Sequence, residues 1–412
     1  MMTMTFPAST ASQRVWNALK RADRLLFSGT LGEALDVYHD VQREVVAFLT
    51  TPQSSWTVAS SETEGHPSLS AACCLIGEFY GLENRWQAWS ILAAPLFNDS
   101  VWHSLPFPMR ARLMVLRGWS AFKRKGFTLN GVIRQQQHCL QEWRQQRQAD
   151  LFTIAGHHLV LCFAYTLAFR FQKARKHGQE ALKLFEQTGS PYYCFKALDM
   201  MGTLEYTARQ YDAATHWHQQ ADDLSRANLQ GGMLTTDFTR GWVLIGQGGF
   251  ENFDKAIARF QRAYALKEYQ GLYYDAARCI YAEAYACFRL HDDPAYSASS
   301  ERLKRAKHFF FEELRPDADA DGIQTPALAY PMKAACLHVE GLILEYQKQF
   351  CAALRKFESA VAFQREVNDP GQMSDMLRRA IYNAWRCRRI DRMIIYGVMF
   401  IILLLRFRVP IL

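Results

Sequence analysis

The chain contains 412 residues, of which 49% are hydrophobic, and this composition excludes a globally disordered protein. Lysine and arginine outnumber aspartate and glutamate by 48 to 40, which gives a formal net charge of +8. Such a small excess does not indicate specific nucleic-acid binding, although it permits an anionic or acidic partner. The length suits two or three ordinary domains or one elongated solenoid.

The ten cysteines show no spacing typical of a metal site or a disulfide framework. The sequence contains no C-x-x-C motif, and most cysteines lie within apolar patterns where a small buried residue is expected. We therefore expect a reducing compartment, with the cytoplasm as the location and the nucleus left open. We expect no cofactor.

The N-terminus lacks the continuous apolar segment of a secretory signal. It carries Arg14, Lys20 and Arg21 and has no acidic residue before Asp23, which partly resembles a mitochondrial presequence. We favour the alternative that residues 1–14 form a disordered tail ahead of the first helix.

Residues 15–314 are predicted to form an array of helix pairs, because the period-two alternation of strands does not recur at regular spacing. Residues 50–67 are rich in Ser, Thr and Pro and are predicted to be a flexible loop within this array. Weak copies of the paired pattern occupy four stretches: Leu19–Gln42, Ala71–Phe97, Met109–Trp143 and Ala276–Phe309.

A stronger repeat places alanines at fixed distances after an aromatic residue. Its copies are Phe171, Ala174 and Ala181; Tyr211, Ala214 and Ala221; Phe253, Ala256, Phe260 and Ala263; and Phe350, Ala353, Phe357 and Ala360. Small residues let two antiparallel helices approach closely, while the aromatic residues fill the gap to the next pair. One pair cannot bury its own apolar face, so the pattern predicts a stack of several pairs.

This pattern resembles the tetratricopeptide repeat family, which also places a glycine near the middle of the first helix. Gly341 precedes the fourth copy and Gly202 the second, in which His218 stands where that family has a large aromatic residue. Cys162 stands in for the glycine of the first copy and Leu244 for that of the third. The repeat of about 40 residues is similar to the longer variants of that family. The resemblance implies an all-α, right-handed superhelical solenoid of antiparallel helix pairs.

The resemblance also implies where a partner would bind. In the tetratricopeptide repeat family, the first helix of each pair lines a concave groove that grips a peptide or helix. At the matching positions of this sequence, that groove would be lined by Leu159, Phe163, Lys196, Asp199, Thr203, Tyr206, His338, Leu342 and Glu345.

Residues 315–331 are predicted to interrupt the array as an acidic, proline-rich linker or insertion. Within them, Asp317, Asp319 and Asp321 alternate as the first ligands of an EF-hand calcium loop do. Leu328 occupies the position of the bidentate glutamate, so we favour a solvated linker over a calcium site. Residues 332–390 are then expected to form a C-terminal repeat and a capping helix.

Residues 391–412 read as a short hydrophobic tail flanked by arginines. Between Arg392 and Arg406 lies an uncharged stretch that is shorter than the roughly 20 residues of a spanning helix. Two interpretations stay open: a membrane anchor, as in tail-anchored proteins of the outer mitochondrial membrane or the peroxisome, or a final helix packed on the last repeat. In the first case the membrane contacts would be Met393, Ile394, Ile395, Phe400, Ile401, Ile402, Leu403, Leu404 and Leu405.

The remaining motifs have structural explanations. The glycine-rich run at residues 246–249 lacks the spacing of a dinucleotide fingerprint and is predicted to be a turn between helices. The neighbouring histidines at 157–158 and 216–218 do not have the spacing of a helical metal site. No combination of Ser, His and Asp indicates a catalytic triad.

The leading hypothesis is therefore a non-enzymatic interaction scaffold or assembly subunit that binds another protein in a concave helical groove. One alternative is a tail-anchored membrane adaptor. The other is a regulator that senses a peptide or metabolite inside the superhelix.

Overall fold

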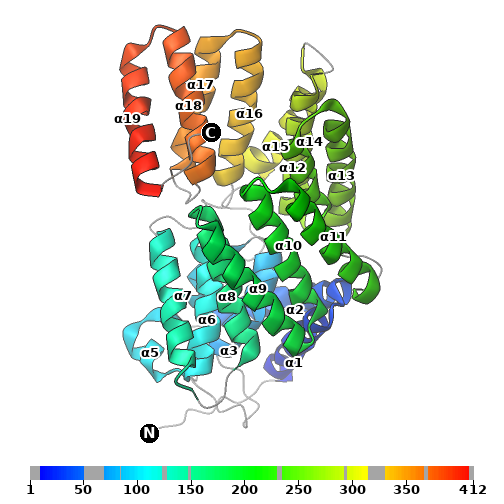
Figure 1. Ribbon diagram of the computed structural model, residues 1–412. Coiled ribbons are helices and arrows are strands. Elements are labelled where there is room, and N and C mark those ends of the chain that lie inside the picture. The colour runs from blue at the N-terminus through cyan, green and yellow to red at the C-terminus, as the bar shows by residue number, and fades with distance from the viewer. Residues whose placement is uncertain are drawn as a thin grey trace.

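The computed structural model describes residues 10–50, 69–83, 85–122, 128–146, 150–229, 234–291, 295–313, 330–365 and 370–407. Over these ranges the chain is helical and contains no strand. The helices form antiparallel pairs that stack along the sequence (Figure 1). The expected all-α solenoid of helix pairs is confirmed.

The first helices of the pairs are α1 (Thr10–Ser28), α3 (Leu69–Leu82), α6 (Phe107–Ala121), α8 (Leu151–Leu167), α10 (Pro191–Thr207), α12 (Asp237–Gln247), α14 (Tyr273–Leu290), α16 (Tyr330–Tyr346) and α18 (Pro370–Arg386). Their partners are α2 (Leu31–Thr50), α4 (Trp86–Ala93), α7 (Leu129–Trp143), α9 (Phe171–Thr188), α11 (Tyr211–Asn228), α13 (Phe250–Tyr269), α15 (Ser297–His308), α17 (Phe350–Gln364) and α19 (Ile390–Phe407). Three short elements depart from this plan: a 3₁₀ turn η3 (Ala94–Phe97), helix α5 (Asp99–Ser104), and a π-helical turn η5 (Phe309–Glu313) that extends α15.

The alanines of the sequence repeat lie on α9, α11, α13 and α17, where each pair of helices is in contact. All eight are at most 1% exposed: Ala174, Ala181, Ala214, Ala221, Ala256, Ala263, Ala353 and Ala360. A larger side chain at these positions would push the helices apart, so the repeat encodes close approach.

Glycines on the first helices face large rings on their partners. A Cβ atom added to Gly202 would lie 2.3 Å from the His218 ring, and one added to Gly341 would lie 2.8 Å from Phe357. His218 therefore occupies the place of the large aromatic residue, as the sequence indicates. The glycine makes room for the ring, and the ring fills the space that the glycine leaves.

In two copies the sequence-based assignment of the small residue is wrong or incomplete. In the third copy, Gly241 rather than Leu244 faces the partner ring, since a Cβ on Gly241 would lie 2.4 Å from Phe260. In the first copy the sizes are exchanged: Gly178 on α9 stands opposite Cys162 on α8, at 3.1 Å from an added Cβ to Sγ. Met201 of α10 also reaches this position, with Sδ 2.2 Å from the added Cβ, and fills the space above Gly178.

The turns between paired helices repeat one backbone geometry. Arg209, Lys348 and Arg388 each adopt a positive φ of about 60°, a conformation that non-glycine residues seldom adopt. In the first of these turns, the Gln210 amide donates to the Glu205 carbonyl oxygen at 2.8 Å, which closes the helix C-terminus. These three pairs therefore share one turn geometry.

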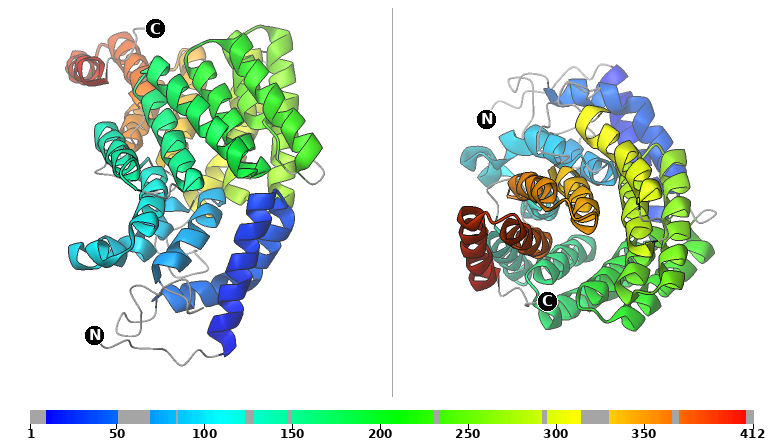
Figure 2. Two further views of the ribbon diagram at one scale, coloured as in Figure 1. Left: turned by 60° about the horizontal axis from the view of Figure 1, so that its bottom comes forward. Right: turned by 90° about the horizontal axis from the view of Figure 1, so that it is seen from above.

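The stack curves until its first pair meets its fifth. Helix α1 contacts α10 directly, and the Ser190 hydroxyl donates to the Phe27 carbonyl oxygen at 2.6 Å. Viewed from above, the pairs wind around one axis, with the C-terminal helices in front of the N-terminal ones (Figure 2). The first helices of distant pairs therefore share one inner surface.

The predicted boundaries need several changes. Helix α1 begins at Thr10, so residues 10–14 belong to the first helix rather than to a tail. Residues 51–67 lie outside the described residues, as do residues 315–329 with Asp317, Asp319 and Asp321. Residues 391–407 belong to helix α19, which begins at Ile390 and pairs with α18, and they do not form a separate tail.

Candidate functional site

The inner surface is built from one face of each first helix. On α10, Lys196, Asp199, Thr203 and Tyr206 follow one another at intervals of three and four residues and so share a face. On α14 the equivalent face carries Arg278, Tyr281 and Tyr285. All seven side chains are partly exposed rather than buried.

Four charged residues from four helices meet in the first part of this surface; we call them the inner charge cluster. Lys196 Nζ of α10 lies 2.9 Å from Glu78 Oε2 of α3, and Arg112 Nη2 of α6 lies 3.3 Å from Asp23 Oδ1 of α1. The Lys196 side chain is 30% exposed and that of Glu78 is 11% exposed. The cluster ties α1, α3, α6 and α10 together where the stack curves back on itself.

The two ion pairs of this cluster differ in their electrostatics. Burial raises the pKa of Asp23, although the Arg112 guanidinium opposes this effect. Burial alone would lower the pKa of Lys196, but the Glu78 carboxylate and Tyr192 outweigh burial and raise it. Lys196 therefore stays protonated and already holds an acidic partner, so its main role is to close the stack.

Four aromatic side chains form the second part of the inner surface; we call them the inner aromatic cluster. They are Tyr206 of α10, Trp242 of α12, and Tyr281 and Tyr285 of α14. The Trp242 ring centroid lies 6.2 Å from that of Tyr281 and 5.5 Å from that of Tyr285. Burial raises the pKa of Tyr206 and of Tyr281, with Tyr285 the next cause in both cases. These residues thus face each other across neighbouring pairs while keeping part of their surface accessible.

Charged groups border the inner aromatic cluster. The Arg278 guanidinium lies 4.7 Å from the Phe238 ring centroid and pairs with Asp275 at 2.8 Å. On α18, burial would raise the pKa of Asp375, but hydrogen bonding to His338 and two arginines lower it to about 2. The surface therefore combines apolar rings with fixed charges of both signs, the composition of many peptide-binding surfaces.

The structure buries three residues of the groove expected from the sequence: Leu159, Leu342 and Glu345, the last of which is 9% exposed. Leu159 and Leu342 are each only 3% exposed and belong to the hydrophobic core. Helical spacing could not separate them from accessible neighbours, because a first helix buries apolar residues on both sides of its inner face. Phe163 is partly exposed and packs against Trp119 and Phe122, with centroids 5.6 and 4.8 Å away.

The other expected groove residues serve mainly to join helices. Asp199 accepts a hydrogen bond from the Thr239 hydroxyl at 2.8 Å. His338 Nε2 lies 2.9 Å from Asp375 Oδ2, and Glu345 accepts from Arg379 at 2.6 Å and from Asn383 at 2.5 Å. Thr203 and Tyr206 remain partly exposed on the inner face.

Sequence reasoning did not identify the inner aromatic residues beyond Tyr206. Tyr281 and Tyr285 stand four residues apart on α14, and Arg278 precedes them by three and seven, which already indicates a shared helix face. The repeat of this pair lacks the alanine pattern of its neighbours, so its register could not be assigned from the sequence.

Helix α19 packs against α18 through one face only. Tyr396 is buried and donates its hydroxyl to Glu358 Oε1 of α17 at 3.0 Å, while Met393, Phe400 and Leu403 pack against the C-terminal core. The opposite face is exposed and apolar: Ile390, Ile394, Ile395, Val398, Ile401, Ile402 and Leu405. Among the described helices, none combines the length and the hydropathy that a membrane crossing requires. The spanning anchor therefore finds no support, and the packed helix describes the structure.

The histidines do not gather into a metal site. Within the described residues no group of three or more His, Cys, Asp or Glu side chains could hold a metal ion. His158 Nδ1 lies 2.9 Å from His177 Nδ1, and burial lowers the pKa of both rings to about 4. His157 is fully buried beside Gln136, and burial lowers its pKa to about 3.

Comparison with known proteins shows a likeness of fold. No protein-family model matches the chain, and no curated protein matches it. A Rap protein crystallised with Competence and Sporulation Factor is similar, with a TM-score of 0.60 and 10% identity over 96% of this chain and 99% of that one.

Two further solved structures share this likeness. The apo quorum sensor NprR from B. thuringiensis has a TM-score of 0.54 at 12% identity, covering 95% of this chain and 98% of that one. Aspartyl phosphate phosphatase F from Bacillus subtilis has a TM-score of 0.50 at 12% identity, covering 100% and 97%. At such low identity the likeness is one of fold: the chain shares with them a tetratricopeptide-like helical repeat fold.

Proposed function

We propose that this protein is a non-enzymatic binding protein whose inner surface holds a peptide segment of a partner. The observation that carries the proposal is the inner aromatic cluster: four partly exposed rings from three successive pairs, bordered by charged groups. Large rigid rings supply contact area at low cost in side-chain entropy, and such residues dominate peptide and protein recognition. A segment lying across α10, α12 and α14 would contact all four rings.

The part of the inner surface that binds is the second, not the first. The inner charge cluster has satisfied its own ion pairs, so a partner would have to break them at a cost of desolvation. The inner aromatic cluster offers partly exposed rings that a partner can contact without breaking an ion pair, which suits a segment with a large apolar side chain. The charges beside it are already paired, Arg278 with Asp275 and Asp375 with His338.

A second candidate function is that of a regulator that senses a peptide, which would bind to the same inner surface. It is favoured by the fold likeness to a quorum sensor and to a Rap protein bound to a named factor. The repeat of about 40 residues supports placing the chain among the long-repeat tetratricopeptide proteins. A cytoplasmic location is supported by ten free cysteines, of which all but Cys351 and Cys387 are buried.

The proposal is tested by selecting binders from a random-peptide display library on the full chain and measuring their affinity by fluorescence polarisation. We expect Tyr281→Ala and Arg278→Gln each to weaken a selected peptide by about tenfold. Tyr269→Ala is the matched control, because Tyr269 is 80% exposed on α13 and outside the inner surface. Equal losses for Tyr281→Ala and Tyr269→Ala, or no loss for either, would contradict the proposal.

A further inference from the structure

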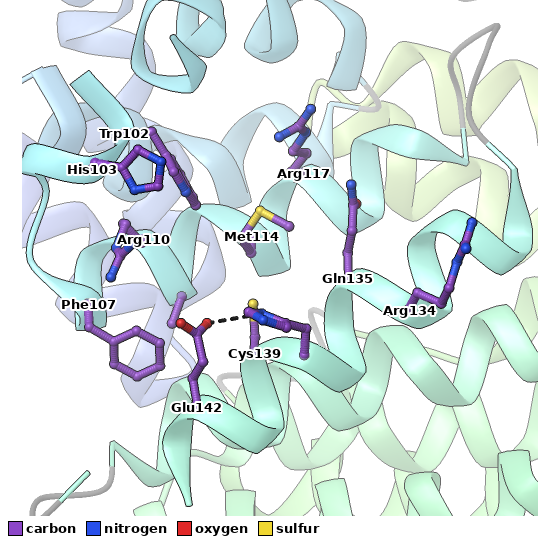
Figure 3. A pocket seen from close by; sticks show the side chains of 12 residues that line it. Trp102, His103, Phe107, Arg110, Met114, Arg117, Arg134, Gln135, Cys139 and Glu142 are labelled. Atoms are coloured by element: carbon purple, nitrogen blue, oxygen red, sulfur yellow. Dashed lines mark ion pairs between the residues drawn. The ribbon is translucent and has the colours of Figure 1, made fainter. Parts of the chain in front are cut away.

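A separate pocket lies between α5, α6 and α7 (Figure 3), and none of its lining residues belongs to the inner aromatic cluster. Its volume is about 530 Å³, within the range of small-molecule sites. The lining residues come from α5 (Trp102, His103), α6 (Phe107, Arg110, Ala111, Met114, Arg117) and α7 (Arg134, Gln135, His138, Cys139, Glu142).

The pocket exists because the preceding pair is incomplete. Helix α4 has 8 residues, whereas the other partner helices have 12 to 20. It contacts α6 but ends at Ala93, and the chain then turns away through η3 and α5. The short α4 therefore leaves part of the groove between α6 and α7 uncovered. Helix α5 contributes only Trp102 and His103 to the edge of this groove.

The pocket has an apolar floor and a cationic border. Ala111, Met114 and Cys139 are buried at its base. Three arginines and two histidines surround them, against one carboxylate, Glu142, which lies 3.3 Å from His138. A ligand that matches this lining has an apolar body and a negative charge.

Two of the arginines have no acidic partner among the residues that the structure describes. They are Arg110, whose Nε is buried without a hydrogen-bond acceptor, and Arg134, which is exposed. A second cavity of about 360 Å³, between α11, α12 and α13, also has a basic lining, but there Arg240, Arg259 and Arg262 are paired with Asp222 and Asp237. An unsatisfied buried guanidinium nitrogen is costly unless an anion completes its hydrogen bonds.

We propose that the α5–α6–α7 pocket binds a small organic carboxylate with an aromatic or aliphatic body. The carboxylate accepts hydrogen bonds from the Arg110 guanidinium, while the apolar body covers Met114 and Cys139. Arg134, at the opposite end of the pocket (Figure 3), adds positive charge to the border. Arginine suits this role because its fixed fork of donors matches the two oxygens of a carboxylate. The site is independent of the inner surface, so either proposal can fail without the other.

The test compares two fluorescent probes that differ only in charge. N-dansyl-phenylalanine carries a carboxylate, and its amide has the same apolar body without the charge. We expect the full chain to bind the acid at least about tenfold more tightly than the amide. Arg110→Gln should remove this preference by weakening the acid alone, and Arg134→Gln should reduce it by a smaller factor.

Arg43→Gln provides the matched control, since Arg43 is an exposed arginine of α2 that does not line the pocket. Thermal melting of each variant reports whether the fold survives, which we expect because Arg110 has no ion pair to lose among the described residues. Equal affinities for acid and amide, no binding of either, or an unchanged preference in Arg110→Gln would each overturn the proposal.

Discussion

Replacing Lys196 by methionine tests whether the inner charge cluster closes the stack. Methionine keeps most of the apolar stem, so the change removes the charge rather than the packing. The Glu78 carboxylate, which is 11% exposed, would then face the interior without its cation. Lys196 would also lose its position 5.3 Å from the ring centroids of both Tyr192 and Tyr193.

The expected loss follows from the burial of the two partners. Removing one member of a fully buried pair costs about 3–5 kcal/mol. Lys196 Nζ retains contact with solvent, since its side chain is 30% exposed, and this screening reduces the effect. We therefore expect Lys196→Met to lower the free energy of unfolding by about 2 kcal/mol. The double variant with Glu78→Gln should recover about half of the loss, because no unpaired charge remains.

The assay is urea unfolding of the wild type, both single variants and the double variant, followed by circular dichroism. The four free energies give the coupling between Lys196 and Glu78 directly. Strictly additive losses, or a Lys196→Met variant as stable as the wild type, would refute the view that this pair fastens α3 to α10.

Three further predictions concern the histidines, the glycines and the turns. His157 stays neutral in the folded protein because burial lowers its pKa, so below pH about 6.5 only the unfolded state gains a proton at this ring. We expect the free energy of unfolding to fall by about 2 kcal/mol between pH 6.5 and 5 for this reason. His157→Gln should remove this part of the pH dependence, as measured by urea unfolding at each pH. Gly241→Ala should cost about 1–3 kcal/mol through collision with Phe260, whereas Gly397→Ala, which meets nothing within 4 Å, should not destabilise. Arg209→Gly should raise the melting temperature, because glycine adopts the left-handed turn without the strain of about 1 kcal/mol that a side chain brings; an unchanged or lower melting temperature would contradict this.

The fold could be predicted because its rule is local. An alanine seven residues after another alanine, preceded by an aromatic ring, specifies how two helices touch, and each copy can be recognised within one pair. The assignment failed in the third copy, where Gly241 rather than Leu244 faces Phe260, and it missed that Gly178 stands opposite Cys162 in the first copy. A pattern read along one helix cannot show that the partner helix has exchanged sizes.

The binding surface could be predicted only in part. Spacing placed Lys196, Asp199, Thr203 and Tyr206 on one face of α10 correctly. It could not show that Lys196 forms an ion pair with Glu78, which lies 118 residues earlier in the chain. That contact depends on how far the stack curves. Leu159 and Leu342 were misassigned for a similar reason, since burial depends on the neighbouring pair.

Hydrogen–deuterium exchange of the full chain, with and without a peptide selected from the display library, shows directly whether the inner surface binds. We predict slower exchange on binding at the inner-face helices α10, α12 and α14, with α11 and α13 unchanged. Protection confined to α11, α13 or the exposed face of α19 would show that partners bind elsewhere on this solenoid.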